Sequence, residues 1–570
     1  MEHRSKVFKF AVIFLLLVPL LIGIVIWASL SNYVGENVQK KPNIILIMAD
    51  DLGSHDVSLR GSNQILTPNI DALGYQGVIF NRHYTAPMCT PTRSSLLTGK
   101  YSIHTGMQHY IIAADQPWCL PLEEKLLPQY LKEAGYKTHI AGKWHLGMAK
   151  KAFTPTHRGF DSHVGSLGPY IDYFNFTHWM SIKPYTPGFD FRYNESVYRD
   201  RVGEYATDVL ADEASKIIYN HDPSGDPLFL YFSQLAPHAA NDVDPVQAIP
   251  EDLEKVGHIK DPKRRTYAAM VKALDRSVGT VVKALKEKGM LENSIIVFFS
   301  DNGGPTKGFV SVEASNYPLK GQKNSPWEGA LRGMALVWSP LLQQRHRVSE
   351  HLTHITDWLP TFAQIAGSTS IKSAELDGFD IWETLSFNKP PVRREMVHCI
   401  DPIIGYSSVY LNGWKYINGT TFNGRFDDWL GEMPFEEDPE SLRYPHLVME
   451  SEVWRALNPF ARRHMKSWDL ERIRKKTKIV CEGQNPISTP CEPLKSPCLF
   501  HVASDPCEVS NLAHVRSSEV ETIENKLRLL LENSVPPGNL PNDPRADPAL
   551  NQGLWTWWLD SNQVTEPAIF

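Results

Sequence analysis

The feature that most constrains the fold of this chain is an alternation of short apolar runs with longer amphipathic segments. NIILIMADD (43–51), PLFLYFSQLAPH (227–238), NSIIVFFSDNGG (293–304) and RGMALVWS (332–339) each begin with a stretch of strand length that has no polar face. Buried strands separated by helices are typical of a mostly parallel sheet that helices cover on both sides. The sequence therefore predicts an α/β fold with a large, mostly parallel or mixed sheet sandwiched by helices.

The same pattern divides the chain into parts. Amphipathic spacing predicts helices within 67–80, 123–147, 209–220, 265–289 and 356–367. The alternation weakens after about residue 385, and residues 415–510 are rich in turns, aromatic residues and cysteine. We expect an N-terminal signal segment with a short linker (1–40), a main domain (41–390) and a smaller, Cys-containing α+β subdomain (391–570) with an antiparallel sheet.

The N-terminus predicts export. Three basic residues precede an apolar run over 10–27, which is longer than a usual signal core and close to the length that spans a bilayer. A cleaved signal peptide and an uncleaved membrane anchor both fit, and each leaves the bulk of the chain lumenal or extracellular. Glycosylation sequons at Asn175, Asn194 and Asn418 suit that side of the membrane. We expect the secretory pathway, with a lysosomal or extracellular location.

Seven cysteines become informative in an exported protein. Four of them, Cys481, Cys491, Cys498 and Cys507, crowd into one short segment and predict a disulfide-linked loop region. An odd count leaves one thiol over, and Cys89 stands apart from that group. With Cys89 unpaired, the other six, which include Cys119 and Cys399, could form three disulfides whose connectivity the sequence does not choose.

Composition excludes one broad class of partner. The net charge is −6 with an isoelectric point near 6.4, and charged residues make up 21% of the chain. A nucleic-acid-binding domain is usually basic. We therefore expect no nucleic-acid partner.

Polar residues recur where predicted strands end. Asp50 and Asp51, then Lys143 and His145, then His238, then Asp301 and Asn302 each follow an apolar run. Ligands of open α/β sheets bind beyond the carboxyl ends of the strands, so we expect these residues to share a pocket. Either acidic pair alone could simply form a turn.

The chemistry of these side chains suggests a metal beside an anion. Carboxylate and amide oxygens suit a hard divalent cation such as calcium, and no His/Cys spacing typical of zinc is present. Beside the metal, cationic residues would complete a site for a tetrahedral anion. Each of them alone could be an ordinary structural or surface residue. They are Arg93, Lys143, His145, His238 and Lys323.

The segment CTPTRSSLLTGKY, from Cys89 to Tyr101, sharpens this interpretation. Cys89, Pro91 and Arg93, with the residues that follow them, resemble the sulfatase family of the alkaline-phosphatase-like superfamily. The resemblance extends over about residues 41–390 and includes PNIILIMADDLG, GYKTHIAGKWHLG, FSDNGG, PLKGQK and WEGALRG. The phrases around 123–151 and 376–385 look most like the arylsulfatase B group, the N-acetylgalactosamine-4-sulfatases.

The resemblance implies a set of roles. A dedicated formylglycine-generating enzyme would convert Cys89 to Cα-formylglycine, the nucleophile, whose hydrate would also reach the metal. Calcium would be held by Asp50, Asp51, Asp301 and Asn302. Arg93 and His145 would hold and activate the hydrate, Lys143, His238 and Lys323 would bind the sulfate, and His238 would protonate the leaving alcohol. Three lysines match no family position and are expected at the surface: Lys272, Lys307 and Lys320.

The resemblance thus implies calcium- and formylglycine-dependent hydrolysis of sulfate esters, with the 4-sulfate of N-acetylgalactosamine in glycosaminoglycans as the expected substrate. Two alternatives remain, an inactive sulfatase-like glycan-binding protein and a phosphodiester or phosphonate hydrolase of the same superfamily. An acidic pH optimum is expected only from the lysosomal relatives. The C-terminal third resembles the family poorly, so the sugar is less firmly implied than the reaction.

Overall fold

The computed structural model describes residues 40–181, 183–308, 311–431, 436–481, 483 and 485–560. Residues from Pro42 onward form one compact unit around a ten-stranded sheet, ordered β13-β2-β12-β11-β1-β10-β4-β5-β8-β9. The central strand β1 (Asn43–Ala49) runs parallel to β10 (Leu228–Ser233) and β11 (Ser294–Ser300). Their apolar residues are fully buried, as expected for strands covered on both faces.

The sheet is mixed rather than purely parallel. Strands β4 (Lys137–Gly142) and β5 (Ser162–Gly165) extend the parallel part beyond β10. On the other side, β12 (Ala335–Trp338) is antiparallel to β11 and to β2 (Val78–Phe80). The short strands β13 (Arg347–Ser349), β8 (Arg192–Tyr193) and β9 (Ser196–Val197) complete the edges. The predicted fold class is confirmed.

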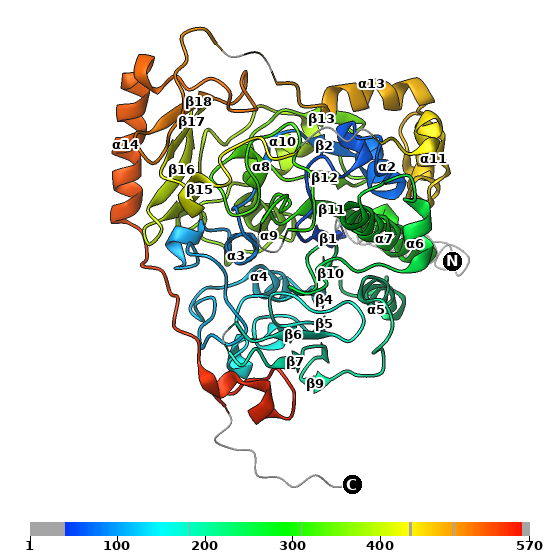
Figure 1. The fold of residues 1–570 in the computed structure, drawn as a ribbon. Coiled ribbons are helices and arrows are strands. Elements are labelled where there is room, and N and C mark those ends of the chain that lie inside the picture. Colours follow the sequence, from blue (N-terminus) through cyan, green and yellow to red (C-terminus); the bar gives the residue numbers. More distant parts are fainter. Residues whose placement is uncertain are drawn as a thin grey trace, which may run out of the picture. The chain divides into compact units, whose positions relative to one another are not determined.

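Helices cover both faces of the sheet (Figure 1). Alternate residues of β1 show the two layers, because Ile45 and Ile47 belong to one hydrophobic cluster and Ile44 and Leu46 to the other. The first cluster includes α2 (Pro68–Gln76), α5 (Ala206–Asn220) and the long α7 (Pro262–Glu287). The second includes α3 (Cys89–Thr98), α4 (Leu127–Glu133) and α9 (Trp358–Ile365).

The C-terminal part contains the expected antiparallel sheet, ordered β15-β16-β17-β18. Its strands are β15 (Glu395–Asp401), β16 (Tyr406–Leu411), β17 (Trp414–Asn418) and β18 (Cys498–His501), and α14 (Ser517–Glu532) packs against it. Helices α11 (Tyr444–Glu450) and α12 (Glu452–Leu457) lie instead against α2, on the main sheet's side of the molecule (Figure 1). Near the end of the described chain, residues 535–543 run along the loop over 103–116, and the residues after them bond to Phe189 and Ala149.

Two expectations about cysteines and lysines are corrected. All seven cysteines lie within the described residues, and four of them form two disulfides, Cys481–Cys507 and Cys491–Cys498, while Cys119 and Cys399 are free like Cys89. Cys399 is buried on β15, whereas Cys119 lies half-buried against Gly147, so they belong to separate parts of the fold.

Lys320 is not a surface lysine, because 94% of it is covered and its ammonium lies 3.8 Å from the ring centre of Trp327 and 4.9 Å from that of Trp429. Burial lowers the pKa of Lys320 despite nearby acidic residues. Lys272 is half-buried with Nζ bonded to the carbonyl oxygen of Leu66, and Lys307 is exposed as expected.

The apolar N-terminal run lies outside the described residues, so the choice between signal peptide and anchor stays a prediction. Within the described part of the chain, every helix is too short or too polar to cross a bilayer. Of the predicted glycosylation sites, Asn175 and Asn418 are exposed. Asn194 is half-buried, and its side-chain oxygen accepts a hydrogen bond from the backbone of His163.

Candidate active site

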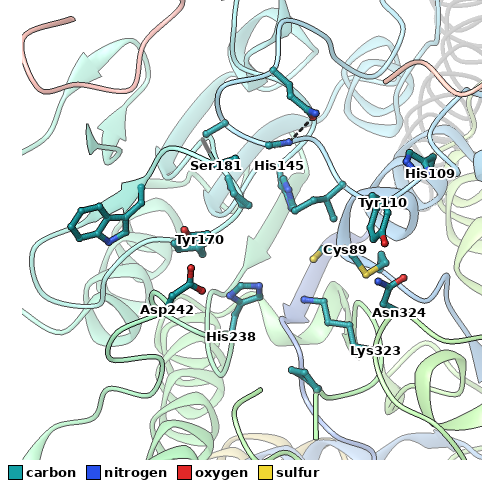
Figure 2. Close-up of a pocket in the computed structure, with 18 of the residues that line it drawn as sticks. Cys89, His109, Tyr110, His145, Tyr170, Ser181, His238, Asp242, Lys323 and Asn324 are labelled. Atoms are coloured by element: carbon teal, nitrogen blue, oxygen red, sulfur yellow. Dashed lines mark hydrogen bonds between the residues drawn. The ribbon is translucent and has the colours of Figure 1, made fainter. Parts of the chain in front are cut away.

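The predicted site residues converge at one edge of the main sheet. Asp50 and Asp51 follow β1, Lys143 and His145 follow β4, His238 follows β10, and Asp301 and Asn302 follow β11. Neighbouring parallel strands bring their carboxyl ends together, which explains why Asp51 and Asn302, 251 positions apart, meet here. The close-up shows Cys89 between His145, His238 and Lys323 in a single pocket (Figure 2).

Cys89 is the first residue of α3, and Met88 before it is extended. The positive end of the helix dipole and its free backbone N–H groups therefore point toward position 89. Arg93 lies one turn further along the same face of the helix, because residues four apart stack in an α-helix. All ten residues of α3 are buried, so its start is held rigidly.

Arg93 links the strand ends under the site. Its guanidinium donates to Ser233 Oγ at 2.6 Å and to the carbonyl oxygen of Lys143 at 3.2 Å. It also donates to Asp301 Oδ2 at 2.9 Å and to Asp50 Oδ2 at 3.2 Å. Burial alone would lower the pKa of Arg93, but the surrounding anionic groups outweigh it and raise that pKa, so the side chain stays charged.

The acidic residues form a buried group of oxygen donors. One donor atom from each of Asp50, Asp51, Cys89 and His238 lies within 4.8 Å of the others. Asn302 is bound to Asp51 through its amide nitrogen at 2.6 Å, which leaves Asn302 Oδ1 available. That oxygen and Asp50 Oδ1 are buried without a hydrogen-bond partner in the described part of the chain. Buried unpartnered oxygens beside carboxylates fit a hard divalent cation.

Two lysines form ion pairs with the carboxylates of Asp50 and Asp51 in this group. Lys143 Nζ lies 2.5 Å from Asp50 Oδ2, and Lys323 Nζ lies 2.7 Å from Asp51 Oδ1. Burial raises the pKa of Asp50, yet Lys143, His238, Arg93 and Lys323 together bring it well below its usual range. Asp301 behaves oppositely, because burial and the charge of Asp50 raise its pKa to about 7.

The two histidines have defined tautomers. His145 Nε2 lies 3.1 Å from the carbonyl oxygen of Ile112, which can only accept, so Nε2 carries hydrogen and Nδ1 does not. Nδ1 has no partner within the described residues, and burial, aided by Lys143, lowers the pKa of His145. In His238, Nδ1 donates to the carbonyl oxygen of Ala239 at 2.7 Å, while Nε2 lies 3.5 Å from Asp51 Oδ2.

Sequence reasoning missed several residues of the site. Ser233 ends β10, donates to the carbonyl oxygen of Lys143 at 2.8 Å and accepts from Arg93. Its place at a strand end beside His238 was the available signal. Tyr170 stacks on His238 with ring centres 6.1 Å apart, and nothing in the local pattern around it indicated this role.

A cavity of about 910 Å³ opens above Cys89. Its walls come from the loop over 109–116, from residues within 169–181 together with Tyr185, from the residues after His238, and from the segment 422–426. The last of these follows the four-stranded sheet's β17, so distant parts of the chain shape the entrance. The volume lies at the upper end of the range for small-molecule sites and exceeds what a single sulfate group requires.

Comparisons with known proteins agree with this geometry. The sulfatase family profile matches residues 42–368. Arylsulfatase J of Mus musculus is 37% identical over 92% of this chain and 81% of its own length. N-acetylgalactosamine-6-sulfatase of Canis lupus familiaris is 32% identical over 60% of this chain and 65% of its own.

Solved structures show the same architecture. The crystal structure of Ps i-CgsB in complex with k-i-k-neocarrahexaose superposes with a TM-score of 0.67 at 26% identity, covering 92% of this chain and 98% of that one. The match spans nearly the whole of both chains, so the C-terminal sheet is included in the likeness. The extent of the profile match and the identity to arylsulfatase J establish that this chain belongs to the sulfatase family.

Proposed function

We propose that this sulfatase hydrolyses the 4-sulfate ester of N-acetylgalactosamine in glycosaminoglycans, with Cys89 converted to formylglycine and a calcium ion bound beside it. The observation that carries the proposal is the position of Cys89. It begins a buried helix at the floor of the cavity, and its sulfur belongs to the group of donor atoms that Asp50, Asp51 and His238 also supply.

The residues around Cys89 fit a cation and an anion at once. Asp50, Asp51, Asp301 and Asn302 would hold calcium, with Asp50 Oδ1 and Asn302 Oδ1 as unused oxygens. The calcium ion would supply positive charge for the sulfuryl oxygens, and hydrated formylglycine an oxygen nucleophile with a second hydroxyl on the same carbon. Lys143 and Lys323 would add the positive charge that a sulfate ester needs when water is excluded.

Two protons have to move, and each histidine is suited to one of them. The bare Nδ1 of His145 can accept a proton from a hydroxyl at position 89, because Ile112 fixes its tautomer and burial keeps the ring neutral. His238 is oriented by its bond from Nδ1 to Ala239, so a protonated ring can deliver the proton on Nε2 to the departing alcohol oxygen. Arg93 supports position 89 from below through Asp50 and Asp301.

The decisive test uses Cys89→Ala made in a secretory host. The variant should fold and be exported like wild type but lose hydrolysis of para-nitrocatechol sulfate, and the wild-type peptide should show the mass change from CH2–SH to CHO. Substantial turnover by the variant would refute the covalent role. An unmodified thiol in an inactive wild-type protein would favour the glycan-binding alternative, and faster turnover of an aryl phosphate than of the sulfate would favour the phosphoester hydrolase.

A second candidate for the sugar is the 6-sulfate ester, since one relative is named an N-acetylgalactosamine-6-sulfatase. Disaccharides that carry N-acetylgalactosamine 4-sulfate or 6-sulfate at the non-reducing end separate the two. Release of sulfate from the first but not the second supports the proposal, and the reverse overturns its choice of position. A lysosomal or extracellular location in the secretory pathway is part of the same proposal, as is conversion of Cys89 by a formylglycine-generating enzyme.

A further inference from the structure

The mouth of the cavity carries aromatic rings that solvent reaches. Tyr110, Trp179, Tyr185 and Phe422 all line the cavity, and each is between 36 and 48% exposed. Large exposed rings gathered around one opening mark a binding surface rather than a core. A sugar ring presents C–H groups on its faces and hydroxyls at its edge, so it can pack on such rings while its edge stays in water. The mouth therefore suits sugars that continue outward from the reacting one.

The cationic groups of this cavity differ in whether they are already paired. Lys323 is bound to Asp51, and His109 Nδ1 lies 2.8 Å from Asp401 Oδ2. Arg425 also lines the cavity, is exposed, and makes no ion pair with a carboxylate that the structure describes. Its guanidinium lies 5.8 Å from the ring centre of Phe426. An arginine in this state can take a carboxylate or sulfate through two parallel hydrogen bonds.

The segment that carries Arg425 is fixed to the catalytic side of the cavity. Thr421 Oγ1 donates to the carbonyl oxygen of Asn324 at 2.5 Å, and the backbone N–H of Gly321 donates to the carbonyl oxygen of Asp428 at 2.9 Å. Asn324 and Gly321 both lie within two positions of Lys323 in the sequence. Arg425 therefore belongs to a wall held at a set distance from the reaction centre rather than to a free loop.

The cavity is also electrically asymmetric. Figure 2 shows Asp242 beside His238 and Tyr170, on the other side of Cys89 from Asn324. Arg425 lies on the segment that Thr421 binds to Asn324, so an anionic substituent is attracted toward that wall and repelled near Asp242. This asymmetry gives a bound sugar chain one preferred direction.

We infer that the cavity mouth binds the sugar next to the sulfated one, and that Arg425 recognises an anionic group, a carboxylate or a second sulfate, on that neighbour. The inference rests on the proposed function, because the sulfated sugar must occupy the reaction centre. Arg425 is a specificity residue here and takes no part in bond breaking.

The test compares substrates that differ in one charge. Trisaccharides with a non-reducing N-acetylgalactosamine sulfate next to glucuronate are assayed beside the same compounds with the carboxyl group reduced to an alcohol, in both the 4-sulfate and the 6-sulfate series. A third compound carries a sulfate on the otherwise reduced neighbour, which separates the two anions. The readout is the ratio of kcat/KM for the acidic to the reduced compound, so that any general loss of activity cancels.

Wild type should prefer an acidic compound by about tenfold, as a charge-assisted arginine contact predicts. Arg425→Gln should bring the ratio close to one, mainly through KM, and Arg425→Lys should keep part of the preference. Arg528→Gln, an exposed arginine on α14 away from the cavity, should leave the ratio unchanged. A preference that survives in Arg425→Gln, or no preference in wild type, overturns the inference.

The failure of the proposed function looks different in the same experiment. If wild type releases no sulfate even from para-nitrocatechol sulfate, the proposed function is wrong and the inference falls with it. If wild type hydrolyses that small ester but none of the trisaccharides, the reaction stands and the inference about the cavity mouth is overturned.

Discussion

Lys415 holds two buried carboxylates together, and its removal should destabilise the protein strongly. Lys415 on β17 lies 3.0 Å from Glu328 Oε1 on α8 (Glu328–Leu331) and 2.8 Å from Glu508 Oε1, and all three side chains are fully buried. We predict that Lys415→Met lowers the free energy of unfolding by about 3–5 kcal/mol, the cost of leaving buried charge unpaired. That is a large part of the 5–15 kcal/mol typical of a folded domain.

The predicted loss depends on pH in a definite direction. Burial raises the pKa of Glu508 to about 7 even with Lys415 opposing it, and the charge of Glu328 adds to the rise. Without Lys415 the folded-state pKa of Glu508 rises further, while in the unfolded chain this glutamate ionises near its ordinary value of about 4.3. The folded variant then binds more protons than the unfolded one above that value, so its stability falls as pH increases.

Urea unfolding of wild type and variant at about pH 5 and about pH 8 checks the sign, and the difference between the two proteins should be larger at the higher pH. The triple variant Lys415→Met, Glu328→Gln, Glu508→Gln serves as the control, because it removes the charges along with their partner and should recover much of the loss. A single variant within about 1 kcal/mol of wild type at both pH values would refute the reasoning.

Three further predictions concern the site and the core. Ser233→Ala should lower kcat for an aryl sulfate about tenfold with a smaller change in KM, because Arg93 loses its 2.6 Å partner; an unchanged kcat would remove Ser233 from the positioning network. His398 is buried, and neither ring nitrogen has a partner within the described residues, so burial, with Lys415 and Arg393, lowers its pKa. The folded form of His398 thus binds fewer protons than the unfolded form, so the free energy of unfolding decreases as pH falls below about 6.5. His398→Phe should flatten this dependence of the unfolding free energy on pH by up to about 1.4 kcal/mol per pH unit. An equally steep dependence in the variant, measured by urea unfolding, would contradict a buried neutral ring. Chelation should abolish activity and lower the unfolding temperature, because the carboxylates of Asp50 and Asp51 repel each other once the ion is removed. Added calcium should restore both properties. Full activity in protein shown by elemental analysis to be metal-free would exclude the ion.

The sequence predicted the strands and most of the site for one physical reason. Strands buried on both faces appear as uninterrupted apolar runs, so the polar residues at their carboxyl ends, such as Asp50 and Asp301, stand out and must meet at one sheet edge. The cysteine pairing and the state of Lys320 could not be predicted in this way. They depend on side-chain directions and on Trp429, which approaches from more than a hundred positions away.

The residues that form the cavity walls could not be predicted from the local sequence either. The segment 415–510 has irregular patterning because its sheet is short and its loops are long, so nothing local indicated that residues 422–426 would line the cavity. Their place follows from tertiary contacts with the loop that carries Lys323. Sequence motifs predicted residues that the structure brings together at one sheet edge, whereas the walls around them became visible only in three dimensions.

The burial of α3 has a consequence for when the protein matures. Cys89 is 1% exposed and every residue of its helix is covered, while the partners of Arg93 lie 50, 140 and 208 positions further along the chain. Any enzyme that converts the Cys89 thiol by reading residues 89–93 in extended form must act before those later strands have been synthesised and packed. A chain that folds first would keep an unmodified and inaccessible Cys89 thiol, so under the proposed function the ratio of two rates, modification against folding, would set how much active protein a cell obtains.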